Sequence, residues 1–289
     1  MNQMHAGIFA KTFVRPSVEE ALDAVAAHGI RSVQFNMACA GLPSLPDAIE
    51  PSVAQRIADA CASRGITMAA VSGTFNVIHP DSRVREDGMR RLDVLAGACK
   101  ALGTGIVTMS TGTRDAENMW RRHADNDSRG AWRDLCASME RAVTIAEKHG
   151  LVLAYEPEVS NVVDTAAKAR RLLDEIRSRR LCVLIDGANL FHSGELPRMH
   201  EILDEAFNLL GPDIVLAHAK DLSRDGEAGD QAAGTGLLDY DFYLKLLKRA
   251  GYRGPLILHG LTESQVPASI DFLDRKLRTL HGSTRKLED

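Results

Sequence analysis

Acidic and histidine residues stand at several points of this chain where a short apolar run ends. These residues are Glu156, Asp186, His218 and His259. Each run has the length and composition of a buried strand. An ionised carboxylate is costly to bury unless a cation or hydrogen-bond donors meet it. Glu156 therefore predicts a partner that comes from another part of the chain.

Carboxylate and imidazole side chains are together typical ligands of a divalent metal ion. Taken alone, an aspartate before a glycine usually forms a turn, and a histidine in an apolar strand is usually a core residue. The same kinds of residue at the ends of successive strands favour one shared ion, which would be Mn, Co, Zn, Fe or Mg. We predict Glu156, Asp186, His218 and His259 as its ligands. His259 could instead contact the substrate.

The elements that must bring these residues together recur along the chain. A helical pattern ends in glycine and an apolar run follows at Gly29, Gly65, Gly103, Gly150 and Gly251. Glycine suits the left-handed position that ends a helix. We predict strands near 7–10, 32–35, 66–71, 106–109, 151–156, 181–185, 214–217 and 256–258. Helices are predicted near 17–28, 51–64, 83–101, 132–149, 163–177, 198–209, 239–250 and 264–280.

This alternation of strands and helices predicts a single α/β domain over residues 1–289, a (β/α)₈ TIM barrel. A doubly wound open sheet is the alternative, but no Gly-x-Gly-x-x-Gly follows the first predicted strand. In a barrel the carboxyl ends of the strands meet at one mouth, which would bring the candidate ligands together. The long polar segments 112–131 and 221–238 follow strands, so we expect them on that face.

Composition excludes several classes of protein. The chain has 289 residues, 26% of them charged, and a net charge of −4, which gives no general attraction to nucleic acid or anionic membrane. It contains no apolar run near the roughly 20 residues of a membrane span, and its first residues do not resemble a signal peptide. We therefore expect a cytoplasmic protein without nucleic-acid or membrane partners. The 5 cysteines form no CxxC pair, which argues against a thiolate zinc site.

Further polar residues near the predicted strand ends are candidate substrate contacts. They are Asn76, His79, Trp120, Glu158 and Asn189. Trp120 lies in the long segment after the fourth strand and could belong to a lid. For each residue a structural alternative exists, namely a loop-forming side chain, a solvated helix face or an exposed charge.

One group of motifs carries a resemblance to a known family. Glu156, Asp186, the sequence His218-Ala219-Lys220-Asp221 and the loop with Gly234, Gly236 and Asp239 resemble the xylose isomerase-like TIM barrels. This is the broad group of sugar phosphate isomerases and epimerases, and the resemblance covers nearly the whole chain. It implies a metal-binding barrel of carbohydrate metabolism. The group also holds dehydratases and apurinic-site endonucleases, but the extra histidine ligands of the endonucleases have no evident counterparts here.

This sequence departs from the family pattern at two positions. Asn189 stands where the family usually has histidine, and His259 stands where it usually has a second glutamate. A metal-bound imidazole has no free lone pair, so His259 would be a poor second base. Proton transfer would then rest on Glu156 and take place on one face of the substrate.

The function that follows is a metal-dependent isomerase or epimerase of a small keto-sugar, sugar phosphate or cyclitol, acting through an enediolate. Glu156 would move the proton on carbon, and Lys220 or His259 could assist at oxygen. A lyase or dehydratase at the same site is the enzymatic alternative, and a binding barrel without turnover is another. The expected partner is a small sugar-like molecule, and a homo-oligomer is left open.

Overall fold

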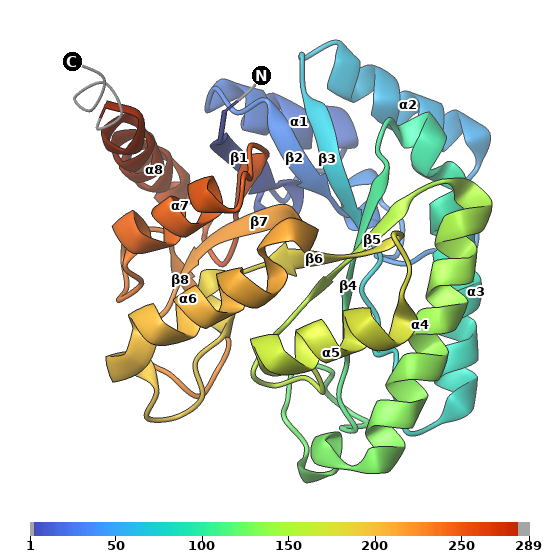
Figure 1. Ribbon diagram of the computed structural model, residues 1–289. Helices are drawn as coiled ribbons and strands as arrows, with labels where there is room; N and C mark the ends of the chain where they lie inside the picture. The colour runs from blue at the N-terminus through green and yellow to red at the C-terminus, as the bar shows by residue number, and fades with distance from the viewer. Residues whose placement is uncertain (1–2, 283–289) are drawn as a thin grey trace.

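The chain folds into a closed barrel of 8 parallel strands surrounded by helices (Figure 1). The computed structural model describes residues 3–282. The barrel strands are β1 His5–Phe9, β2 Ser32–Phe35, β3 Thr67–Ser72, β4 Ile106–Ser110, β5 Val152–Glu156, β6 Leu181–Ile185, β7 Ile214–Asp221 and β9 Pro255–Leu258. They pair in the order β6-β5-β4-β3-β2-β1-β9-β7, and pairing of β6 with β7 closes the ring. The predicted TIM barrel is therefore confirmed.

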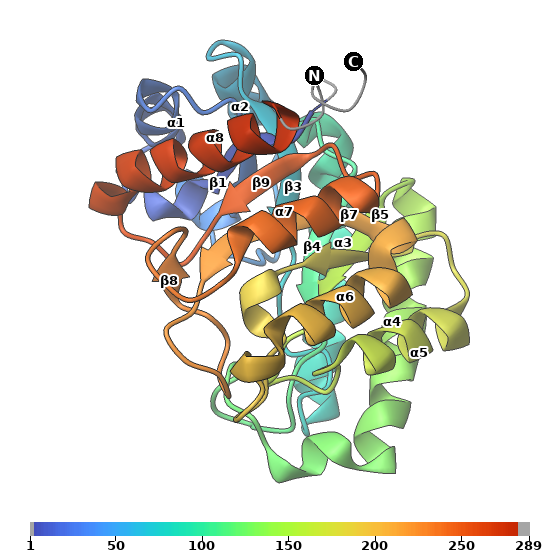
Figure 2. The same ribbon diagram turned by 60° about the vertical axis from the view of Figure 1, so that its left-hand side comes forward.

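The helices lie outside the strands, and α6, α7 and α8 cover the outer side of β7 and β9 (Figure 2). Their bounds are α1 Val18–Ala27, α2 Pro51–Ala62, α3 Ser82–Leu102, α4 Arg129–His149, α5 Ala166–Ile176, α6 Met199–Leu210, α7 Tyr240–Arg249 and α8 Val266–Gly282. Gly103 and Gly150 end α3 and α4 in the left-handed conformation, as their place in the sequence predicts. None of the described helices is long and apolar enough to cross a bilayer.

Two helices begin three residues away from the predicted start. Helix α4 begins at Arg129 rather than near 132, because the Ser128 hydroxyl caps it by accepting a hydrogen bond from the Ala131 amide. Helix α5 begins at Ala166 rather than near 163, because Thr165 caps it through the Lys168 amide. In both cases a hydroxyl residue in extended conformation fixes the first turn.

Strand β7 is longer than predicted and pairs with a short additional strand. It continues to Asp221, and the strand β8, Gln231–Ala232, pairs with its end in antiparallel fashion. Lys220 lies opposite Ala232 and Asp221 opposite Gln231. The predicted loop 221–238 therefore begins inside a strand, which holds Lys220 in regular structure at the barrel mouth.

Alternate residues of each strand face the barrel interior. Phe9, Ala70, Ala154, Leu184, Leu216 and Ile257 form an inner cluster that is distinct from the main core between strands and helices. For all of these except Phe9, the residue two positions further along the chain shares this orientation. These residues are Ser72, Glu156, Asp186, His218 and His259. The inner apolar layer thus forms the floor on which the candidate site lies.

Candidate metal centre

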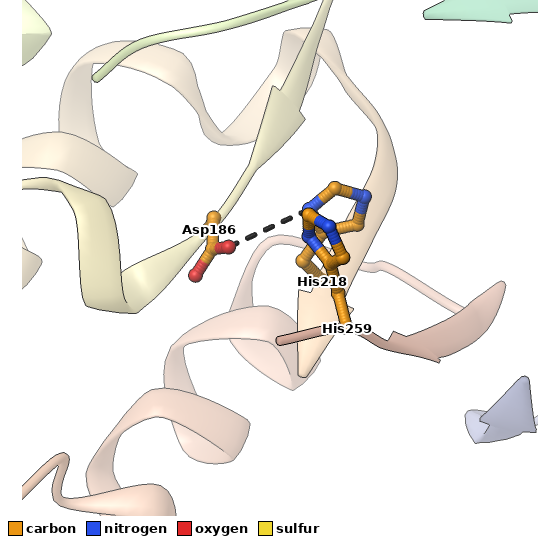
Figure 3. A group of neighbouring side chains, drawn as sticks. All are labelled: Asp186, His218 and His259. Carbon is orange, nitrogen blue, oxygen red and sulfur yellow. Dashed lines mark ion pairs between the residues drawn. The ribbon is translucent and has the colours of Figure 1, made fainter. Parts of the chain in front are cut away.

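Three of the predicted ligands meet at the mouth of the barrel. Asp186 follows β6, His218 lies in β7 and His259 follows β9, and each offers one ligand atom within 4.8 Å of the others. Figure 3 shows the Asp186 carboxylate facing the two imidazole rings. Nδ1 of His218 lies 3.5 Å from Oδ2 of Asp186. Barrel closure therefore brings together residues that are far apart in the chain.

The atoms that face one another in this group lack hydrogen bonds. Oδ2 of Asp186, Nδ1 of His218 and Nδ1 of His259 are buried, and none has a hydrogen-bond partner among residues 3–282. Buried polar atoms are normally paired. Oδ2 of Asp186 does lie 3.2 Å from Nζ of Lys220, without hydrogen-bond geometry. One carboxylate and two imidazoles with unused lone pairs fit a divalent transition metal ion.

Gln34 fixes which nitrogen of His218 is available. Nε2 of His218 donates a hydrogen bond to Oε1 of Gln34 (2.9 Å), and Nε2 of Gln34 donates to the Thr108 hydroxyl (3.4 Å). Because Nε2 carries a proton, the lone pair of the neutral ring is on Nδ1, which faces Asp186. Gln34 was not predicted as a site residue, although its inward place in an otherwise apolar strand is a usable signal.

The two histidines differ in charge. Burial alone would lower the pKa of His218, but the Glu156 and Asp186 carboxylates outweigh burial and raise this pKa to about 9. For His259, burial and the neighbouring His218 charge both hold the pKa well below its usual range. The neutral His259 ring is therefore ready to coordinate, whereas His218 must release a proton before it can bind a cation.

The charges of Asp186 and Lys220 depend on each other. Burial opposes ionisation of Asp186, yet the Lys220 ammonium and His218 keep the pKa of this carboxyl below its usual range. Lys220 is only 5% exposed, and although burial favours its neutral form, Asp186 and Glu156 raise its pKa. Both groups are therefore charged at neutral pH.

Glu156 lies beside the group of three ligands but does not belong to it. Its Oε1 is 3.4 Å from Nδ1 of His218 and accepts a hydrogen bond from Nδ2 of Asn189 (2.7 Å). Oδ1 of Asn189 accepts in turn from the Gly229 amide (3.1 Å), so the orientation of this amide is fixed. Oε2 of Glu156 receives no hydrogen bond from the part of the chain that is described. Asn189 thus positions Glu156, and its contact with substrate stays a prediction.

Glu158 is a second carboxyl group near the metal centre. It is 4% exposed, and its Oε1 has no hydrogen-bond partner among the described residues. Burial, and then the charge of Glu156, raises the pKa of Glu158 to about 8. The side chain is therefore buried, and the alternative of an exposed loop charge does not hold.

Asn76 and His79 are occupied by loop hydrogen bonds. Asn76 donates to the carbonyl of Thr113 (2.8 Å) and accepts from its amide (3.1 Å). Nε2 of His79 contacts the carbonyl of Ala116 (3.1 Å), and its Nδ1 accepts from the Asp81 amide (3.1 Å). These bonds join the segments that follow β3 and β4. Neither side chain contacts the metal group, and substrate binding by either one stays a prediction.

Trp120 lies in the long loop after β4 and is 52% exposed. The arginines that follow it do not point freely into the mouth, because Arg121 pairs with Asp115 and Arg122 with Asp164. The loop is therefore held by ion pairs. A contact between Trp120 and substrate stays a prediction.

Polar residues on β2, β3 and β4 complete the inner wall. Besides Gln34 they are Ser72, Thr108 and Ser110, and all are buried. Sequence reasoning missed them because serine and threonine in a strand have no distinctive pattern except their alternation. They give the wall formed by β2, β3 and β4 hydroxyl and amide groups that suit a hydroxylated ligand.

A family model described as "Xylose isomerase-like TIM barrel" matches residues 22–276 of this chain. No curated protein matches the chain at a significant level. Solved structures match nearly the whole of this chain. A D-tagatose 3-epimerase-like protein has a TM-score of 0.78 at 16% identity, with 97% of this chain and 100% of that chain covered.

Two further structures show the same fold. The IOLI protein, solved with a bound zinc atom, has a TM-score of 0.73 at 16% identity and covers 96% of this chain and 99% of its own. The 3-keto-D-glucoside 4-epimerase YcjR from E. coli has a TM-score of 0.70 at 17% identity, with coverages of 96% and 100%. At these identities the likeness establishes the fold of the chain.

Proposed function

This chain belongs to the xylose isomerase-like TIM barrel family, and we propose that it is a divalent-metal-dependent isomerase or epimerase of a small keto-sugar, sugar phosphate or cyclitol. The observation that carries the proposal is the buried group of Asp186, His218 and His259 beside the Glu156 carboxylate, with Oδ2 and two Nδ1 atoms that lack hydrogen-bond partners among the described residues. Two of these structural neighbours are a sugar epimerase and an epimerase-like protein, and a third was solved with a bound zinc atom, which supports both parts of the proposal.

Asp186, His218 and His259 would hold the ion, with Glu156 as a further ligand or as a neighbour. When bound, a divalent ion would supply Lewis acidity that polarises a substrate carbonyl. The donor set favours Mn, Co, Zn or Fe over Mg, because two of the three donors are imidazole nitrogens.

Glu156 is the candidate general base. Its carboxylate is oriented by Asn189 through Oε1, while Oε2 is not engaged by any described residue. It would remove the proton from the carbon next to the carbonyl and return it to the neighbouring carbon, which converts a ketose to an aldose or a second ketose. Lys220, held beside Asp186, would donate a hydrogen bond to the oxygen on which negative charge develops.

The position of His259 favours chemistry on one face of the substrate. Its ring belongs to the metal group, and the low pKa of the ring makes it a neutral ligand. Inversion at carbon by two bases would need a second proton acceptor on the opposite face. A 1,2-isomerisation needs only Glu156, and we therefore favour it over a two-base epimerisation.

The test is exchange of substrate hydrogen with solvent. Metal-loaded protein is incubated in D₂O with a panel of ketoses, and deuterium next to the carbonyl is measured by NMR. We expect exchange with at least one ketose and a loss of about 10²-fold or more in Glu156→Gln, the usual size of a general-base contribution. His259→Gln should bind metal weakly and recover partly with added metal.

The matched control is Glu140→Gln, which changes an exposed carboxylate on α4 and should leave exchange unchanged. Wild-type protein that is fully loaded with metal but exchanges no ketose would refute the proposed function. A His259→Gln protein that keeps its metal but loses exchange on one epimer only would make His259 a second base.

A further inference from the structure

The cations around the barrel mouth are almost all paired with carboxylates. The loops that follow β2, β3, β5 and β9 contain no lysine or arginine. In the other loops and at the end of β7 the ion pairs are Arg15–Glu263, Arg114–Asp134, Arg121–Asp115, Arg122–Asp164, Arg198–Glu201, Arg224–Glu227 and Lys220–Asp186. Within residues 3–282, Lys11 is the one cation of this set without a carboxylate partner.

Lys11 is held next to the metal centre by an aromatic ring. It lies in the short helix η1, Ala10–Thr12, directly after β1. Its Nζ stands 4.6 Å from the centroid of the Phe9 ring. Phe9 faces the barrel interior, and its ring meets that of His259 edge-on at 5.3 Å between centroids. A single ring therefore separates the ammonium group from a candidate metal ligand.

The surroundings of Lys11 are unusual for a lysine. Burial lowers the pKa of Lys11, and the group whose charge opposes this effect is the Cys39 thiol rather than a carboxylate. The side chain is nevertheless exposed to solvent, so a ligand can reach it. Because no described carboxylate pairs with this ammonium group, a bound anion can take that place.

The charge of the mouth also suits an anionic ligand. A divalent ion, Lys220 and Lys11 together would carry more positive charge than Asp186, Glu156 and Glu158 carry negative charge. A mouth with a net positive charge and a low-dielectric wall attracts anions.

We propose that Lys11 binds an anionic group of the substrate, so that the substrate is a sugar phosphate or a sugar acid rather than a neutral sugar. This inference rests on the proposed function, because it places the rest of the sugar between Lys11 and the metal centre. The anionic group would contact the exposed side of the Lys11 ammonium group, and the Phe9 ring would remain in contact with the opposite side. Lys11 would thereby select the substrate and fix which end of it reaches Glu156.

The test measures binding separately from turnover. Calorimetry on metal-loaded protein compares fructose, fructose 6-phosphate and 2-keto-gluconate, which represent the neutral, phosphate and carboxylate cases. We expect at least one of the two anions to bind more tightly than fructose. Lys11→Met should weaken binding of that anion by about 10- to 100-fold, as expected for the loss of a charged hydrogen bond. The affinity for fructose should stay unchanged. Lys11→Arg should restore part of the affinity.

Arg15→Met is the matched control, because it removes a positive charge from the same loop that is already paired with Glu263. It should change the preference for anions by less than Lys11→Met. The inference is overturned if wild-type protein binds fructose as tightly as both anions, or if Lys11→Met keeps the preference. A failure of the proposed function would be detected by a different measurement: the protein would still bind these ligands but would show no deuterium exchange.

Discussion

At the scale of single residues, Glu158 is a carboxyl group in a position that disfavours its charge. Its pKa rises from an ordinary 4.5 to about 8 on folding. Between these values the unfolded chain is ionised while the folded protein keeps its proton. The folded state thus binds more protons, so the metal-free protein should lose stability as the pH rises from about 4.5 to about 8.

Glu158→Gln should abolish this contribution to the pH dependence, because glutamine does not ionise. Between pH 5 and pH 8, the free energy of unfolding of the variant should rise relative to that of wild type by up to a few kcal/mol. One pKa unit corresponds to about 1.4 kcal/mol. Urea unfolding at both pH values measures the difference. Parallel pH profiles for the two proteins would show that Glu158 ionises normally.

Residue types at strand ends were enough to locate part of the site. Asp186, His218 and His259 were predicted because carboxylates and imidazoles at the ends of buried strands need a partner. The structure groups all three. Gln34 and Thr108 could not be found in this way, since their importance depends on a hydrogen bond to His218 across the barrel. The bonds that engage Asn76 were hidden for the same reason, because their partners belong to another loop.

At the scale of elements, Asp221 organises the loop between β7 and α7. Its Oδ1 accepts hydrogen bonds from the amides of Leu222 (3.0 Å) and Leu238 (2.9 Å), and its Oδ2 accepts from the amide of Gly234 (3.1 Å). A Cβ atom on Gly236 would lie 2.4 Å from Oδ1 of Asp221. Gly236 is thus needed because the loop wraps closely around this carboxylate.

Asp221→Ala should therefore destabilise the protein more than an ordinary surface change. It leaves three amides without their acceptor, two of them those of Leu222 and Leu238 in a buried setting, for which we expect a loss of about 2–4 kcal/mol. Denaturant unfolding measures the loss, and Asp230→Ala, in the same loop, is the control. A loss no larger than that of the control would show that water replaces these bonds.

The elements themselves were predictable to the extent that their causes are local. Glycine at the helix ends and the apolar runs after them fixed the order of strands and helices, and closure of the barrel followed from their number. Strand β8 was missed because it is two residues long and exists only through pairing with Lys220 and Asp221. The starts of α4 and α5 were misplaced in opposite directions because the caps Ser128 and Thr165, which fix the first turn of each helix, were not used in the prediction.

At the scale of the whole molecule, the metal centre joins strands on both sides of β7. Asp186 follows β6 and His259 follows β9, while His218 lies in β7, which pairs with both of these strands. In the unfolded chain these residues are far apart and cannot share an ion. Metal binding should therefore stabilise the folded barrel as a unit.

Purified wild-type protein should bind one divalent ion per chain and melt at a higher temperature when it is loaded. At a free metal concentration of 100 times Kd the gain is about 2.7 kcal/mol. Asp186→Asn should lose this gain, because it removes the charged ligand while keeping the shape of the side chain. It should also be less stable than wild type without metal, since Lys220 is then buried without its nearest carboxylate.

Asp59→Asn, an exposed change on α2, should respond to metal as wild type does. Elemental analysis and thermal melts with and without chelator measure both effects, and an Asp186→Asn protein that is stabilised by metal as strongly as wild type would place the ion elsewhere.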